Sequence, residues 1–294
     1  MTTPVSQCFA IQYKPSLLAA IAVTVSFAVT TAIHLAQLIR HRTFYFITFA
    51  LGGVCEIVGY LARSIVATEY PSCTKVPYIL NTVLPLMAPA LFAASMYMVL
   101  GHIIRQTEGE ELALVRASWR TKILLLGDVL SGVTQAIGGV MLTRATSNSD
   151  TERGESLIAI GLVIQLAFFC LFFVLCIHYD FRLRNNLTDA SWNVDWQTYL
   201  GVLYFSGGLI LIRTTFRLVE YIQGDDGELR SSEVYLYLFD AALMLPAMLV
   251  FNFKHPRSLV ILVLQAGILG NQGGKQFNHL QPIAIKIEVL ATQS

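Results

Sequence analysis

Charged residues are scarce in this chain. They make up 13% of its 294 residues, against about 25% in an average soluble domain. Hydrophobic residues make up 55%, and a soluble core cannot enclose that much apolar surface. The net charge of +1 also provides no basic surface for a nucleic acid. Composition therefore excludes an ordinary soluble domain and a nucleic-acid-binding protein, and it indicates an integral membrane protein.

Several motifs of membrane enzymes and pumps are also missing. The stretch closest to a phosphate-binding loop, Gly-Gly-Lys-Gln at 273–276, lacks the leading glycine and the hydroxyl residue of that motif. No lysine lies in the middle of an apolar stretch, which excludes the retinal Schiff base of the microbial rhodopsins. The six histidines never form an i, i+4 pair of ligands, so we expect neither a metal site nor a cofactor.

What the chain does contain is a series of apolar stretches long enough to cross a membrane. A helix of about 20 apolar residues spans the hydrocarbon layer of ~30 Å. An eighth apolar run, 259–269, is too short to cross. We predict an all-α, seven-transmembrane-helix bundle at 17–253 between an N-terminal tail (1–16) and a C-terminal tail (254–294). The seven predicted spans are 17–38, 44–66, 79–104, 121–143, 156–178, 199–222 and 233–253.

The distribution of Lys and Arg predicts the orientation of this bundle. Twelve of these residues fall in or beside the odd-numbered loops and the C-terminal tail, and five in the N-terminal tail and the even-numbered loops. Positively charged loops stay in the cytosol, so we predict the N-terminus outside and the C-terminus in the cytosol. Cys8 and Cys73 then both lie outside, where they either form a disulfide or remain two separate thiols.

Ionisable residues inside the predicted spans are the candidate functional residues. A charge near the middle of a span costs about 2.5–3.5 kcal/mol on the insertion scale, so such residues face one another or water rather than lipid. Glu56, Tyr60 and Arg63 follow an i, i+4, i+7 spacing that places them on one helix face, and the sixth span repeats that spacing. The seven residues are Glu56, Arg63, Asp128, Arg213, Arg217, Glu220 and Asp240.

Their depths predict where the charges gather. Counted from the span centres, Glu56 lies near the midplane and Asp128 lies in the inner half. The other five residues lie toward the outer leaflet. We therefore expect a network between helices in the outer half. For the peripheral Arg63 and Glu220, a purely structural role is an equal alternative. Gln135 extends the polar lining beside Asp128, although such amides more often join two helices.

A block across the sixth and seventh spans carries a family resemblance. It comprises Ile-Leu-Ile-Arg-Thr-Thr-Phe-Arg-Leu-Val-Glu-Tyr at 210–221, Gly-Asp-Asp-Gly at 224–227, and then Glu233, Tyr237 and Asp240. This block resembles the signature of the fungal lipid-translocating exporters, the family of aminocholesterol-resistance and sphingoid long-chain-base-resistance proteins. Further matches bring the similarity to about residues 10–256. The resemblance implies a seven-span protein of the fungal plasma membrane, or of another fungal membrane, that moves amphiphilic lipids or protects against them.

We therefore expect a non-enzymatic transporter of an amphiphilic lipid such as a sphingoid long-chain base. The ammonium group of the lipid would lie near Glu56 and Asp240, while Arg213 and Arg217 balance the empty site or hold a phosphate. One alternative is a seven-span, receptor-like lipid sensor. A less favoured alternative is an intramembrane terpene cyclase with Glu56 or Asp128 as the acid, because nearby arginines favour the ionised form that cannot donate a proton.

Overall fold

The computed structural model describes residues 13–71, 74–115, 117–145, 147–224, 227, 229 and 232–254. Within these ranges the secondary structure is helical, with no β-strand. Seven of the helices are long and apolar enough to cross a membrane, which confirms the predicted seven-helix fold and makes the chain a multi-pass membrane protein. Cys8, Cys73 and the tail from residue 255 lie outside the described residues, so the disulfide stays a prediction. The orientation of the termini also stays a prediction.

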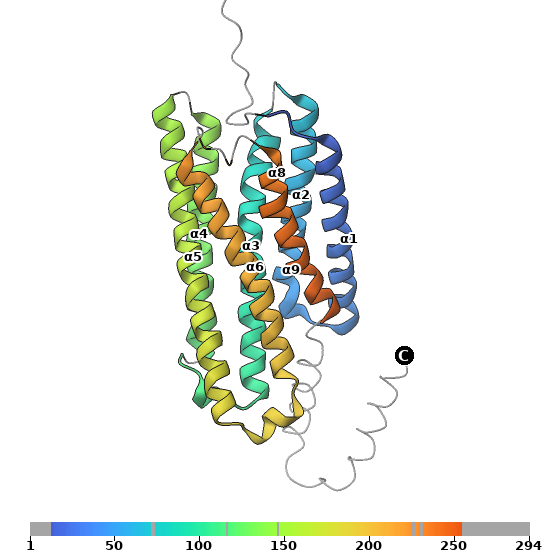
Figure 1. The fold of residues 1–294 in the computed structure, drawn as a ribbon, viewed down its shortest axis with the longest axis vertical. Helices are drawn as coiled ribbons and strands as arrows, with labels where there is room; N and C mark the ends of the chain where they lie inside the picture. The colour runs from blue at the N-terminus through green and yellow to red at the C-terminus, as the bar shows by residue number, and fades with distance from the viewer. Residues whose placement is uncertain are drawn as a thin grey trace, which may run out of the picture. The chain divides into compact units, whose positions relative to one another are not determined.

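The seven spans run in chain order from α1 to α9 (Figure 1). Short 3₁₀ turns, η1 (Phe44–Phe46), η2 (Glu110–Leu112) and η3 (Asp189–Asn193), lie between some of them. The seventh span has three consecutive pieces, with a turn of π-helix in the middle. The helices are α1 (Leu17–His41), α2 (Ile47–Glu69), α3 (Lys75–Gln106), α4 (Ala117–Arg144), α5 (Asn148–Asn185), α6 (Trp196–Gln223), α8 (Glu233–Leu236), the π turn η4 (Tyr237–Ala241) and α9 (Ala242–Phe253).

These helices contain the seven apolar stretches, except that the first three residues of 44–66 form η1, and they extend beyond most of the stretches. The largest extension is in α5, which has 38 residues and reaches past both ends of the 156–178 stretch. The additional turns at the two ends of α5 are polar and contain charged residues such as Asp150 and Arg184. Hydropathy detects only the part of a helix that lies in hydrocarbon, so a helix that continues into water is longer than its apolar stretch.

α3 lies at the centre of the bundle. In Figure 1, α1 and α2 lie on one side of it, α4 and α5 lie on the other, and α6 crosses obliquely. In the apolar stretch of α3, 72% of the residues are buried, against 28% in α1, which turns much of its surface outward. Gly59 of α2 allows close approach to α3, since an added β-carbon would lie 2.6 Å from Cγ of Pro85. The close packing of α2 on α3 brings their polar residues next to α6.

The start of α1 is fixed by contacts that also reach the seventh span. The Ser16 hydroxyl caps α1 by accepting a hydrogen bond from the Ala19 N–H. The Ser16 N–H donates to both carboxylate oxygens of Glu233, at 3.0 and 2.8 Å. The segment before α1 is thus attached to the start of α8, at the upper end of the bundle in Figure 1.

Candidate functional site

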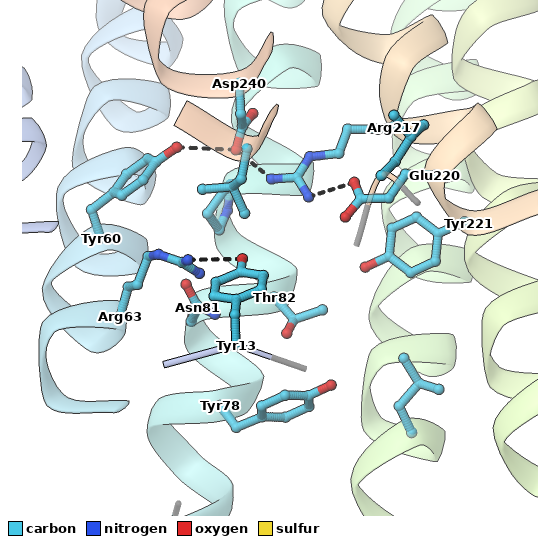
Figure 2. Close-up of a pocket in the computed structure, with 14 residues that line it drawn as sticks. Tyr13, Tyr60, Arg63, Tyr78, Asn81, Thr82, Arg217, Glu220, Tyr221 and Asp240 are labelled. Carbon is cyan, nitrogen blue, oxygen red and sulfur yellow. Dashed lines mark hydrogen bonds and ion pairs between the residues drawn. The ribbon is translucent and has the colours of Figure 1, made fainter. Parts of the chain in front are cut away.

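A polar pocket lies at the end of the bundle that holds residues 13–16. Its volume is about 80 Å³, and it is lined from α2, α3, α4, α6, the seventh span, the segment before α1 and Leu229 (Figure 2). Two arginines and two acids contribute to the lining, and they are Arg63, Arg217, Glu220 and Asp240. Four tyrosines, Tyr13, Tyr60, Tyr78 and Tyr221, add aromatic faces and hydroxyl groups. A pocket with this lining, set in an apolar bundle, suits the polar part of an amphiphile.

Asp240 is the centre of the charged residues around this pocket. Its side chain is 1% exposed and forms ion pairs with the guanidinium groups of Arg213 and Arg217. The Tyr60 hydroxyl also donates to Asp240 Oδ2 at 3.1 Å. Arg217 continues the chain of contacts by donating to Glu220 Oε2 at 2.9 Å. Figure 2 shows the sequence of contacts from Tyr60 through Asp240 to Arg217 and Glu220, which joins α2, the seventh span and α6.

Asp240 is the fourth of the five residues of the π turn η4. A π turn places more residues in one turn than an α-helix does, so it changes the direction in which the following side chains point. Such turns occur often at functional sites. Here the turn carries the carboxylate that pairs with both arginines of α6.

The prolines of α3 explain the position of Arg213. Pro89 has no N–H, so the carbonyl of residue 85, four positions earlier, lacks its usual helical donor. Arg213 Nη2 donates to that carbonyl at 2.5 Å. In the same way Pro85 leaves the carbonyl of Asn81 without its helical donor, and both Pro85 and Asn81 line the pocket. One freed carbonyl thus holds an arginine, and the other belongs to a pocket residue.

Arg63 joins the segment before α1 to the seventh span. It donates to Glu233 Oε1 at 2.9 Å, to the Tyr13 hydroxyl at 3.0 Å and to the Tyr237 hydroxyl at 3.2 Å. Its side chain is 2% exposed. Three directed bonds from one planar guanidinium are a geometry that a lysine ammonium does not reproduce. Arg63 therefore holds Tyr13 and Glu233 together at the end of the pocket.

Glu56 has a different environment from these paired residues. Its side chain is 0% exposed, yet neither carboxylate oxygen has a hydrogen-bond partner among the described residues. Arg213, Arg217 and Asp240 are its charged neighbours. Glu56 is not part of the pocket lining, but Tyr60, one turn further along α2, is. Glu56 thus lies one helical turn away from the pocket lining, beside the charged residues but hydrogen-bonded to none of them.

Asp128 and Gln135 lie elsewhere in the bundle. Asp128 of α4 is 4% exposed and lies beside Tyr97 of α3. In the described ranges, neither of its carboxylate oxygens has a hydrogen-bond partner of normal geometry. Gln135 donates to Ser131 Oγ at 2.7 Å and to Gln165 Oε1 at 2.9 Å. It therefore joins α4 to α5, and neither it nor Asp128 lines the pocket.

The structure thus brings together most, but not all, of the residues that the sequence singled out. Arg63, Arg213, Arg217, Glu220 and Asp240 meet around the pocket with Glu56 next to them, whereas Asp128 and Gln135 lie apart.

Sequence reasoning did not select Glu233 as a site residue, although it pairs with Arg63. A signal was present, because Glu233, Tyr237 and Asp240 have the same i, i+4, i+7 spacing as Glu56, Tyr60 and Arg63.

Among the residues that the structure describes, no group of three or more His, Cys, Asp or Glu side chains is placed to hold a metal ion.

The fold and the pocket define a class, the seven-helix membrane proteins with a charged site buried near one end of the bundle. Residues 49–262 match the model of a protein family described as "RTA1 like protein". This chain belongs to that family, which confirms the resemblance to the fungal lipid-translocating proteins. The matched residues include Arg63, Arg217, Glu220 and Asp240 of the pocket.

Individual relatives agree with this assignment. Protein RTA1 of Saccharomyces cerevisiae is 36% identical over 231 residues, 78% of this chain and 71% of that protein. Protoporphyrin uptake protein 1 of the same yeast is 36% identical over 215 residues, 73% and 69% of the two chains. The sphingoid long-chain base transporter RSB1 of S. cerevisiae is 24% identical over 277 residues, 82% and 72% of the two chains. No solved structure matches the chain.

Proposed function

We propose that this protein is a non-enzymatic transporter that moves a sphingoid long-chain base, or a related toxic amphiphile, and so confers resistance to it. The main observation in support of this proposal is the pocket lined by charged and tyrosine residues. The name of the relative RSB1, a sphingoid long-chain base transporter, supports the substrate class. The plasma membrane is the proposed location, with the pocket in the outer half of the bundle.

The size and lining of the pocket support a headgroup site. An apolar cavity of about 150 Å³ holds one benzene, so a pocket of about 80 Å³ accommodates a small headgroup and not a long hydrocarbon chain. The chain of the amphiphile would remain in lipid beside the apolar helix faces. Tyrosine faces attract an ammonium group, and the Asn81 carbonyl and the Glu220 carboxylate can accept its hydrogen bonds.

The pairing of the acids supports transport rather than proton-transfer catalysis. Both acids that line the pocket, Glu220 and Asp240, accept hydrogen bonds from Arg217. Such pairing favours the ionised form, which cannot protonate an isoprenoid. The two acids proposed for a terpene cyclase, Glu56 and Asp128, do not line the pocket. The site therefore supports the transporter proposal and does not support the cyclase alternative.

A pair of matched substitutions tests the proposal. Thr82 of α3 lines the pocket, whereas Thr215 is exposed on the outer face of α6. Thr82→Phe should fill the pocket and abolish resistance when the protein is expressed in a yeast strain sensitive to a toxic long-chain base. Thr215→Phe should preserve resistance, because its ring faces lipid. Both proteins must reach the membrane in equal amount, and full resistance with Thr82→Phe would refute a role for the pocket.

A further inference from the structure

The acids and bases around the pocket can be paired one to one, except for a single acid. In the described part of the chain, Arg63 pairs with Glu233, Arg213 with Asp240, and Arg217 with both Glu220 and Asp240. Three guanidinium charges thus meet three carboxylate charges. Glu56 is the fourth carboxyl group, and its ionisation would leave this buried cluster with a net charge of −1.

The hydrogen bonds and ion pairs that the structure shows for the two arginines of α6 go to groups other than Glu56. Arg213 donates to the Pro85 carbonyl and pairs with Asp240, and Arg217 is directed at Glu220 and Asp240. No described residue donates a hydrogen bond to either oxygen of Glu56, and its side chain has no exposed surface. A carboxylate in that position would have neither water nor a donor, which makes the ionised form far less favourable than the neutral acid.

The other groups around Glu56 do not change this balance. The charged groups that act on it are Arg213 and Arg217 of α6 and Asp240 of η4, and all three are paired. On α2 itself the neighbouring ionisable groups are Cys55 and Tyr60, which are neutral at ordinary pH.

The helices on either side of this part of α2 also contribute no charge. The glycines that flank Glu56 in sequence pack on uncharged side chains: Gly53 on Thr31 of α1, and Gly59 on Pro85 of α3. Within this cluster of described residues, electroneutrality therefore requires a proton on Glu56.

We propose that Glu56 is a proton-binding site, and that its proton is exchanged for the ammonium group of the transported base. This inference rests on the proposed function. When the ammonium group binds, the O–H bond of Glu56 breaks, the proton leaves to water, and the carboxylate pairs with the ammonium. The site is neutral with the proton bound and neutral with the ammonium bound. With both or with neither it carries a buried net charge, so one cation enters as the other leaves.

Tyr60 is the residue between the pocket and this acid. It lines the pocket, lies one turn from Glu56 on the same face of α2, and donates to Asp240. A headgroup that reaches Glu56 displaces the Tyr60 ring or its bond to Asp240. The exchange thus takes place behind the pocket seen in this structure.

Infrared spectroscopy of the purified full-length protein in lipid tests the protonation directly. The carbonyl stretching band of a protonated carboxylic acid should weaken in Glu56→Gln and keep its intensity in Asp180→Asn, because Asp180 is paired with Arg184 and does not belong to the cluster around Glu56. Equal bands in the wild type and in Glu56→Gln would overturn the proposal, whatever the protein transports.

Proteoliposomes with a lumenal pH dye test the exchange. A long-chain base is added outside liposomes that have equal pH on both sides. Protons should then move in the direction opposite to the base, and they should move faster than in protein-free liposomes. Glu56→Gln should abolish this movement. Base translocation without proton movement would refute the exchange and leave the proposed function standing. If no amphiphile is translocated by the wild type, the proposed function fails and the exchange fails with it, while the infrared result still decides the protonation of Glu56.

Discussion

Replacement of Asp240 by Asn tests the role of the ion-pair cluster in the stability of the bundle. The substitution keeps the size of the side chain and removes the charge that faces two buried arginines. Arg213, which is 0% exposed, would keep only the Pro85 carbonyl as a partner, and Arg217 would keep only Glu220. Loss of one partner from a buried ion pair costs about 3–5 kcal/mol, because a charge is left uncompensated. Since Asp240 neutralises two arginines, we expect a destabilisation of about 5 kcal/mol.

Asp128→Asn is the matched control for this prediction. It is the same chemical change in another buried acid of a transmembrane helix, but the described residues include no basic partner for Asp128. We expect its free energy of unfolding to change by less than about 1 kcal/mol. The measurement is a titration of the purified protein in mixed micelles with a denaturing detergent, followed by loss of helical circular dichroism. If the two variants lose the same stability, or if Asp240→Asn is as stable as the wild type, the ion pairs do not hold the bundle together.

Two further substitutions test particular contacts. Arg63→Lys should lower the free energy of unfolding by about 1–3 kcal/mol, because an ammonium cannot serve three acceptors in the plane of the guanidinium. It should also speed amide hydrogen exchange in residues 13–16. Unchanged exchange would contradict the role of Arg63 as an anchor of this segment. Gly59→Ala should cost about 1–3 kcal/mol of stability in the same titration, since the new methyl group overlaps Pro85. The control Gly208→Ala should cost little, because no atom lies within 4 Å of its added β-carbon. Equal losses in the two variants would show that the α2–α3 contact is not tight.

The number of helices could be predicted from the sequence because a membrane makes one demand on every span. Each must be apolar over about 20 residues, and hydropathy reports that directly. The same demand identified Asp240 and Arg213 as residues that must be paired, since a lone charge in hydrocarbon is unfavourable. Glu233 escaped this reasoning because it begins its helix, where a charge costs little, and its importance comes from Arg63 on another helix.

The partners of the buried acids could not be predicted, because spacing along one helix does not identify the neighbouring helix. Asp240 and Glu56 were expected to share an ammonium group, with Arg213 and Arg217 balancing the empty site. In the structure both arginines pair with Asp240, which also accepts a hydrogen bond from Tyr60. Glu56 was grouped with it and proves to be unpaired among the described residues. The π turn that carries Asp240 also has no simple sequence signal, and only the three-dimensional structure separates the paired acid from the unpaired one.

The most direct test of the proposed transport is a translocation assay with matched lipids in proteoliposomes. A fluorescent long-chain base with a free ammonium group is compared with its N-acetylated, neutral analogue, each corrected for its rate in protein-free liposomes. We predict protein-dependent translocation of the cationic base, little movement of the neutral analogue, and loss of movement with Thr82→Phe. Equal rates for the two lipids would contradict a charged headgroup site, and binding of the base without any movement would favour the receptor-like sensor over the transporter.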